Sequence, residues 1–337
     1  MRESEPDPTD DPSGRTMRPR RLRRNASLRD WVAETDLLPR HLVYPIFVAP
    51  GLRSAEPIPS MPGVSRLPVA DLSELARGLA QEGIRSVLLF GVARTKDEEG
   101  SDAWSPDGVV PEAVRAIKKA VPTTVVVTDV CLCAYTTHGH CGIVKEGAID
   151  NDASTERLGR VAVAHARAGA DVVAPSAMMD GQVAAVRGAL DAAGFSETAI
   201  LSYSSKHASS LYNPFRDAEQ STPAFGDRRS YQMDYRNGRE ALREMRLDVA
   251  EGADLLMVKP ALTSLDLLAR ARRRFFLPLA AYQVSGEYAM IKAAAANGVV
   301  DERALVLETL TAMRRAGADL VITYFARDVA RWAREGA

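Results

Sequence analysis

Two lysines occupy apolar surroundings in a chain that otherwise prefers arginine. Of its 337 residues, 36 are Arg and only 7 are Lys. Lys259 follows the run Leu-Leu-Met-Val, and Lys206 ends the stretch 200–205. Burial lowers the pKa of an amine, and so does a second ammonium group nearby. A neutral amine can form a Schiff base with a ketone or aldehyde. Two lysines that extend past the rim of a fold into solvent would produce the same pattern.

All three cysteines lie within eleven residues. Cys131 and Cys133 are followed by Cys141, with His138 and His140 inside the segment. Three cysteines cannot make a disulfide framework, whereas thiolates at this spacing suit Zn2+. Three protein ligands leave a fourth position for water or substrate, as in catalytic zinc sites. The alternatives are a structural site with a histidine as fourth ligand, and a set of inert buried thiols.

The stretch 204–232 reads as a loop of more than 25 residues that contains Arg216, Arg228 and Arg229. Long loops without regular structure are usually lids or binding loops in compact domains. Because arginine can hold a carboxylate through two parallel hydrogen bonds, we predict a lid that binds an anionic substrate. We expect these guanidinium groups to be solvated in the free protein. The alternative for each is an ordinary surface arginine.

Eight short β-rich runs alternate with amphipathic helical stretches. The predicted strands span 41–48, 86–92, 123–130, 171–174, 199–205, 254–259, 278–284 and 319–325. The predicted helices span 69–81, 111–120, 156–168, 182–193, 239–251, 265–274, 289–296 with 302–315, and 327–334. Eight such units predict an α/β fold, a (β/α)8 TIM barrel with an extended N-terminal arm. A doubly wound open sheet is the alternative, but neither GxGxxG nor GxxxxGK[ST] is present.

Polar side chains gather where the predicted strands end. In a barrel these ends meet at the face that carries the chemistry. The residues at the ends of strands three to eight are Asp129, Cys131, Ser176, Lys206, Lys259, Ser285 and Tyr324. If the strands simply ended in solvent, serine and aspartate at their ends would be expected. The presence there of two of the chain's seven lysines is less well explained in this way.

The composition limits the partners. The chain has 46% hydrophobic residues, and its 43 basic and 44 acidic side chains give a formal charge of -1, which does not favour nucleic acid or an anionic membrane. The longest apolar stretches, such as 170–177, are far shorter than the roughly 20 residues that cross a bilayer. The first 25 residues lack the apolar segment of a secretory signal, so we expect a cytoplasmic protein.

The sequence predicts three regions. Residues 1–17 read as a disordered acidic tail, 18–40 as an N-terminal arm, and 41–337 as the barrel. The basic run 18–24 is more typical of a solvated or subunit-contacting arm than of a nucleic-acid patch.

Several long motifs resemble the porphobilinogen synthase family, also called 5-aminolevulinate dehydratase. They are VTDVCLCAYTTHGHCG, APSAMMDGQV, YSSKHASSLYNPFRDAEQSTPAFGDRRSYQMD, GADLLMVKPAL, YQVSGEYAMI and ITYFARD. The resemblance runs in order from about Arg18 to the C-terminus. It implies condensation of two 5-aminolevulinate molecules to porphobilinogen with loss of two waters, in tetrapyrrole (haem) biosynthesis.

The resemblance also implies residue roles. Lys259 matches the lysine that binds the first substrate as a Schiff base, Lys206 the one that holds the second, and Asp129 an acid close to both. The residues that match carboxylate-binding positions are Ser285 and Tyr324 for the first substrate, and Arg216, Arg228 and Gln232 for the second. The residues that match metal positions are Cys131, Cys133 and Cys141 for catalytic Zn2+, and Glu244 for an allosteric Mg2+ of some bacterial members.

Relatives of this kind assemble as octamers, with the arm of each subunit on a neighbouring barrel. The chain departs from some members at Ala177 and Gln182, where they carry an acidic residue and an arginine, so contacts around Ser176 are expected to differ. Two other functions compete with this one: a Schiff-base aldolase, which needs one lysine and no thiolate site, and a non-catalytic metal-binding barrel.

Overall fold

The computed structural model describes residues 18–335, which fall into two units, 18–36 and 37–335. The predicted disordered tail, 1–17, lies outside the described residues. The first unit contains the short helices η1 (Pro19–Arg23) and α1 (Ala26–Trp31). Asn25 begins α1 by accepting a 2.9 Å hydrogen bond from the Leu28 amide. No residue of this unit is buried, and Trp31 is 79% exposed.

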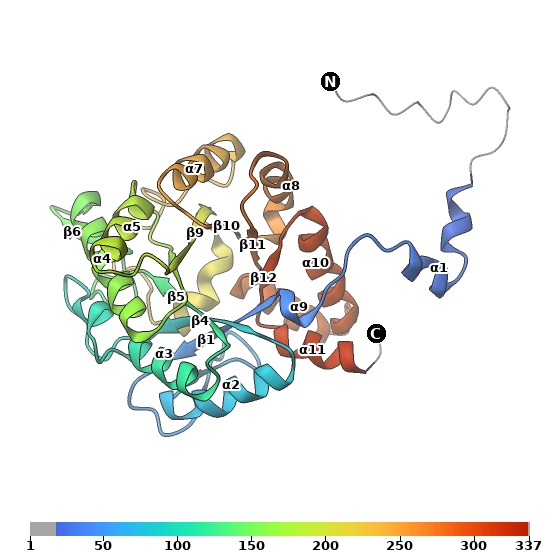
Figure 1. The fold of residues 1–337 in the computed structure, drawn as a ribbon, viewed down its shortest axis with the longest axis horizontal. Coiled ribbons are helices and arrows are strands. Elements are labelled where there is room, and N and C mark those ends of the chain that lie inside the picture. The colour runs from blue at the N-terminus through green and yellow to red at the C-terminus, as the bar shows by residue number, and fades with distance from the viewer. Residues whose placement is uncertain (1–17, 336–337) are drawn as a thin grey trace. The chain divides into compact units, whose positions relative to one another are not determined.

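The second unit is a closed parallel barrel, which confirms the predicted fold (Figure 1). Its eight strands are β1 (Leu42–Val48), β4 (Ser86–Gly91), β5 (Val125–Val130), β8 (Val172–Pro175), β9 (Ala199–Lys206), β10 (Leu255–Lys259), β11 (Leu279–Tyr282) and β12 (Leu320–Ile322). Each strand pairs with the next, and β12 pairs with β1 through Leu42 opposite Val321. The strands are rich in Val, Leu and Ile because both faces are buried.

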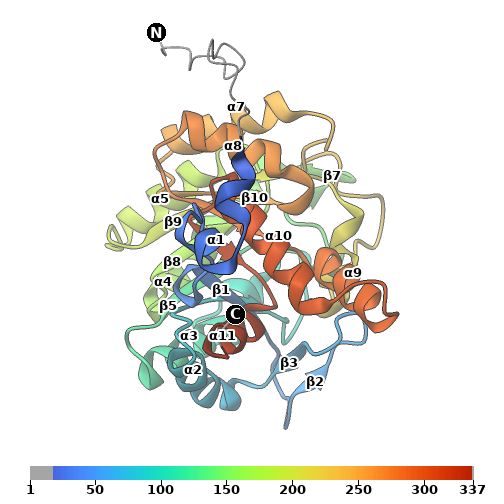
Figure 2. The same cartoon turned by 90° about the vertical axis from the view of Figure 1, so that its right-hand side faces the viewer.

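Helices cover the outside of the strands (Figures 1 and 2). They are α2 (Leu72–Gln81), α3 (Val109–Ala120), α4 (Asn151–Ala168), α5 (Gln182–Ala192), α7 (Gly238–Ala250), α8 (Leu265–Arg274), α9 (Ser285–Ala296), α10 (Glu302–Ala316) and α11 (Ala326–Arg334). Helix α4 ends at Gly169, whose φ of 104° is a conformation that glycine adopts at no steric cost.

Small elements decorate this frame. They are the strands β2 (Glu56–Pro57), β3 (Ser65–Leu67), β6 (Ile143–Lys145) and β7 (Ala148–Asp150), and the 3-10 turns η2 (Pro39–His41), η3 (Val69–Asp71), η4 (Ser101–Trp104) and η6 (Leu262–Ser264). Strand β3 extends the sheet beside the end of β1, and β6 pairs with β7 as a hairpin.

The segment after β9 corrects one expectation. We predicted a structureless loop over 204–232, but β9 continues to Lys206, and the segment contains η5 (Ser210–Tyr212) and α6 (Asn213–Ala218). Proline at the start of α6 suits the first turn of a helix. The predicted lid therefore carries Arg216 on a short helix, whereas Arg228 and Gln232 lie in bends of the segment that follows it.

Within residues 18–335, no helix combines the length and the apolar character needed to span a bilayer.

Candidate active site

Lys259, the last residue of β10, ends in a box of aromatic rings. Its Nζ lies 4.4 Å from the ring centre of Tyr282, 4.8 Å from Phe215, 5.0 Å from Tyr203 and 5.2 Å from Tyr212. Aromatic faces attract a cation, but these rings also exclude water, and burial is the larger effect. Burial and then the Lys206 ammonium lower the pKa of Lys259 from 10.5 to about 7. The amine is therefore partly neutral at neutral pH.

Lys206 is the immediate neighbour of Lys259. The two residues are paired in the parallel register of β9 and β10. Lys206 Nζ donates a 2.5 Å hydrogen bond to the Ser176 carbonyl, just after β8, and lies 5.6 Å from the Tyr203 ring. Both lysines are at most 6% exposed, so the solvent-reaching alternative is wrong.

A bulge in β9 brings Tyr203 and Lys206 to the same side. Between Ser202 and Ser205 this strand advances three residues while β10 advances two, from Leu256 to Val258. Regular alternation would place Tyr203 and Lys206 on opposite faces, and the extra residue cancels this difference. The aromatic box around Lys259 depends on this irregularity.

Asp129 is one of two acidic residues that line the small cavity, with Glu219. It lies near the end of β5 and lines the same small cavity as both lysines. Burial raises the pKa of its carboxyl, opposed by Lys206, by a hydrogen bond from Ser176 and by Lys259. Because burial and the nearby cations act on its pKa in opposite directions, the Asp129 carboxyl can exchange protons with a reacting group.

The three cysteines converge beside this pocket. Their Sγ atoms all lie within 4.8 Å of one another, the thiols are buried, and Cys131 and Cys133 are 3.4 Å apart. Hydrogen bonds from these two thiols hold the pKa of Cys141 well below its ordinary value. Clustered soft donors with one favoured thiolate fit a divalent metal such as zinc.

The histidines of this loop do not join the cluster. The ring of His140 contacts the Tyr231 hydroxyl at 3.1 Å and the Phe225 carbonyl at 3.0 Å, and His138 Nδ1 accepts from the His140 amide. Within the described part of the chain, the three cysteines alone form a group close enough to share a metal. Both ring nitrogens of His140 are engaged by other groups, so the structure does not favour it as the fourth ligand, and His138 and Glu219 also lie outside the group of three cysteines.

The lid arginines are less solvated than we predicted. Arg228 is only 5% exposed, and its guanidinium donates to the carbonyls of Gly139 at 2.9 Å and Ser221 at 2.6 Å. The expectation of solvation is thus wrong for Arg228, because neutral carbonyls take the place of water. Arg216 on α6 is partly exposed and donates to Asn213 Oδ1 at 3.2 Å.

Gln232 is buried with an unused amide. It is 2% exposed, and neither its oxygen nor its nitrogen has a hydrogen-bond partner among the described residues. A buried amide without partners costs free energy, which a bound ligand could recover. Gln232, Arg216 and Arg228 line one pocket of about 1100 Å³ outside the small cavity.

Ser285 and Tyr324 contact two residues of the aromatic box around Lys259, Phe215 and Tyr282. Ser285 begins α9, and its Oγ accepts from the Phe215 amide at 2.9 Å, which fastens α6 to the barrel. The Tyr324 hydroxyl lies 3.0 Å from that of Tyr282. Neither residue lines the small cavity in this closed arrangement.

Helix α6 closes the site. The cavity that contains Asp129, both lysines and Cys133 measures about 20 Å³, and Phe215 and Arg216 of α6 form part of its wall. This volume corresponds to about one water molecule, which is too small for an organic substrate. The cavity must therefore widen to admit an organic substrate, and α6 forms part of the wall that would have to move.

The loop after β8 explains how the departures at Ala177 and Gln182 are accommodated. Gln182 is buried, accepts from the Met179 amide and donates to the Pro175 carbonyl, both at 3.4 Å. Ala177 is fully buried. The glutamine thus braces the loop that presents the Ser176 carbonyl to Lys206.

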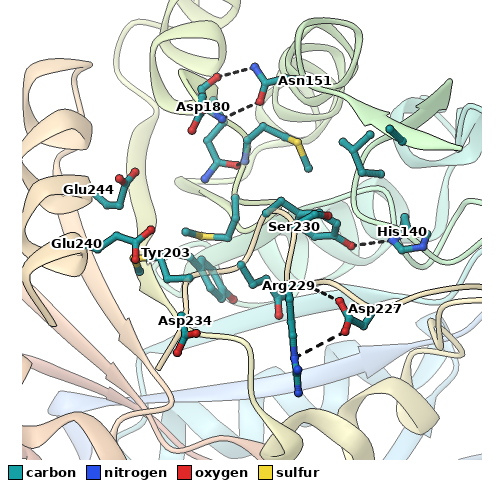
Figure 3. A pocket seen from close by; sticks show the side chains of 18 of the residues that line it. His140, Asn151, Asp180, Tyr203, Asp227, Arg229, Ser230, Asp234, Glu240 and Glu244 are labelled. Atoms are coloured by element: carbon teal, nitrogen blue, oxygen red, sulfur yellow. Dashed lines mark hydrogen bonds and ion pairs between the residues drawn. The ribbon is translucent and has the colours of Figure 1, made fainter. Parts of the chain in front are cut away.

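Glu244 lies elsewhere. It is on α7 in a pocket of about 790 Å³, together with Glu240 (Figure 3). Asp248 also lines this pocket. Burial raises the pKa of Glu244, while Arg243, whose Nε is 3.7 Å away, opposes this rise. Glu244 does not line the small cavity that contains both lysines and Asp129.

Sequence reasoning missed several residues of the site. Phe215, Tyr203 and Tyr212 gave no signal because they read as ordinary core aromatics. Glu219, directly after α6, is 2% exposed, and burial followed by Asp129 raises the pKa of its carboxyl to about 8. It also gave no signal, since a glutamate in a polar loop reads as exposed.

A parallel barrel with polar and ionisable side chains gathered at the carboxyl ends of its strands is the arrangement of barrel enzymes, whose active sites lie at that face. The family model for delta-aminolevulinic acid dehydratase matches residues 16–332. The chain belongs to this family of lyases, as its motifs indicated.

Individual relatives agree with this assignment. The chain is 53% identical over 321 residues to the delta-aminolevulinic acid dehydratase of Synechococcus elongatus, covering 94% of this chain and 98% of the relative. It is 54% identical over 313 residues to that of Escherichia coli, covering 93% and 96%. The crystal structure of the Toxoplasma gondii enzyme with its reaction product porphobilinogen has a TM-score of 0.92 and 47% identity, covering 95% of this chain and 92% of that one.

Proposed function

We propose that this chain condenses two 5-aminolevulinate molecules to porphobilinogen. One C–C and one C–N bond form between the two molecules, and two waters leave. The observation that carries the proposal is the Lys259 amine, which lies within 5.2 Å of four aromatic rings and has a pKa of about 7. The names of the relatives and the product in the Toxoplasma gondii structure support it.

Lys259 binds the first substrate covalently. Its neutral nitrogen forms a bond to the keto carbon, the carbonyl oxygen leaves as water, and the two amine protons end in that water. Lys206 holds the second substrate, and its position beside Lys259 in the strand register supports this role. Asp129 moves protons between the nitrogen atoms and the departing oxygen.

Two sets of donors bind the substrate carboxylates. Ser285 and Tyr324 bind the first carboxylate, and they gain access to it when α6 moves and the Ser285 contact with Phe215 opens. Arg216, Arg228 and Gln232 bind the second. The unpaired buried amide of Gln232 and the shared pocket of the three residues support this assignment.

Cys131, Cys133 and Cys141 hold the catalytic metal, which is Zn2+. When bound, the ion supplies a Lewis acid that polarises a substrate oxygen. A second ion, allosteric Mg2+, binds beside Glu244. The acidic neighbours Asp180, Glu240 and Glu251, which favour a cation near this carboxylate, support this second site.

The protein assembles as a cytoplasmic octamer, and the arm contacts a neighbouring subunit. Residues 18–36 support this role because they bury none of their own side chains, although they include Leu22, Trp31 and Val32, which are exposed.

A direct assay tests the activity. Purified protein with Zn2+ and 5-aminolevulinate should form a product that gives a coloured adduct with an aldehyde reagent and has the mass of porphobilinogen. A Schiff-base aldolase or a non-catalytic barrel would form none. The same assay on Lys259→Met should show no product.

A further inference from the structure

Glu219 places a carboxylate against the thiol cluster. Its Oε2 accepts a hydrogen bond from the Cys133 thiol at 3.4 Å. The side chain is 2% exposed and lines the small cavity together with Cys131, Lys206 and Lys259.

The backbone around Glu219 is held in place by other elements. Arg66 of β3 donates from Nε to the Ala218 carbonyl and from Nη2 to the Asp217 carbonyl, both at 2.7 Å. Lys96, in the loop after β4, donates to the Gln220 carbonyl at 2.5 Å. These cations cap the end of α6, where carbonyl groups have no partner within the helix. The carboxylate is therefore presented to Cys133 by a fixed turn.

A purely structural role would leave this carboxylate poorly compensated. Among residues 18–335, Glu219 forms no ion pair within 4.0 Å, so Arg228 opposes the rise of its carboxyl pKa only from a greater distance, and the Cys133 thiol is a weak donor. Burial of a carboxylate without a strong partner costs free energy. A divalent cation at the neighbouring thiols would compensate that charge.

The chemistry of the donors completes the argument. Cys131, Cys133 and Cys141 offer three sulfur ligands, and structural zinc sites take four ligands from sulfur, nitrogen and carboxylate oxygen. We propose that Glu219 supplies the fourth ligand to the metal held by the three cysteines in the closed, substrate-free protein. Because Glu219 lies outside the group of three cysteines, its side chain would have to move from Cys133 toward the other two sulfurs to bind the ion. This inference rests on the proposed metal site.

Metal affinity is the direct test. Zn2+ affinity is measured by competition with a chromophoric chelator for the wild type, Glu219→Gln and Glu219→Ala, and the visible spectrum is recorded after Co2+ loading. Loss of the ligand should weaken Zn2+ binding by roughly ten- to a hundredfold and change the Co2+ ligand-field bands. Glutamine keeps the size of the side chain, so its circular dichroism and melting temperature verify that the fold is retained.

Glu98→Gln is the matched control. Glu98 is an exposed glutamate whose carboxylate accepts from Thr137 Oγ1 at 3.4 Å in the same cysteine loop. Its replacement should leave Zn2+ affinity and the Co2+ spectrum unchanged. If both Glu219 variants also match the wild type, the fourth-ligand role is refuted while the cysteine site stands. If wild-type protein and Cys133→Ser bind Zn2+ equally weakly, the cysteine site itself is refuted, and the role of Glu219 with it.

Discussion

Replacing Lys259 by methionine should stabilise the fold at neutral pH, because the buried amine destabilises it. Lowering a pKa from 10.5 to about 7 corresponds to roughly 5 kcal/mol, at about 1.4 kcal/mol per tenfold change in proton affinity. Methionine has similar length and packs well against the four aromatic rings. The free energy of unfolding of Lys259→Met should therefore exceed that of the wild type by several kcal/mol at pH 7.

The extra stability of Lys259→Met over the wild type must decrease as the pH rises. Below about pH 7 the lysine is charged in both the folded and the unfolded protein, so the full penalty applies. Between about pH 7 and 10.5 the unfolded chain binds a proton that the folded protein does not, and wild-type stability rises with pH. The advantage of Lys259→Met should therefore shrink steadily over this range and vanish near pH 10.5.

Urea unfolding of the wild type and Lys259→Met at pH 6.5, 8 and 9.5 measures this difference. Lys119→Met, on an exposed position of α3, is the control and should change stability by less than about 0.5 kcal/mol at every pH. A difference that is absent, or that stays constant between pH 6.5 and 9.5, would refute the desolvated amine.

Three further predictions concern the metal, the lid and the acid. Chelation should abolish porphobilinogen formation and Zn2+ should restore it with unchanged circular dichroism, because the barrel core does not depend on the ion; an active Cys131→Ala variant in metal-free buffer would contradict this. Arg216→Ala should raise KM by roughly ten- to a hundredfold with little change in melting temperature. Arg228→Ala should raise KM similarly and also lose about 1–3 kcal/mol of stability, because two carbonyls lose their donor. Steady-state kinetics and thermal melting measure both effects; lysine variants should recover only part of the affinity, and wild-type kinetics in either alanine variant would refute the role of that arginine. Asp129→Asn should lower kcat by roughly 10²–10⁴-fold in a folded protein, and an unchanged kcat would exclude it as the proton carrier.

The barrel could be predicted because its signals are local. Alternating β-rich runs and amphipathic helices identify eight units, and all eight strands occur close to their predicted places. The lysines could be found for a related reason: an amine at the end of an apolar run must be desolvated wherever such a strand is buried. The cysteines are near one another in the sequence, so their convergence needs no long-range contact.

The closure of the site could not be predicted, because it depends on contacts between distant segments. The bulge that turns Tyr203 toward Lys206 follows from the register between β9 and β10, which no single strand specifies. Arg228 is buried because the carbonyls of Gly139 and Ser221 meet around it. Glu219 is directed inward by Arg66, 153 residues earlier in the chain, which anchors the preceding turn.

The central claim is that the Lys259 amine binds substrate as an imine near neutral pH. Borohydride reduction with 5-aminolevulinate, followed by peptide mass spectrometry over pH 5.5 to 9.5, measures this directly. The account predicts a single adduct on Lys259 whose yield rises with a midpoint near pH 7, where about half of the amine is neutral. Product formation without an adduct on Lys259, or labelling that rises only above pH 9 as for an ordinary lysine, would contradict it.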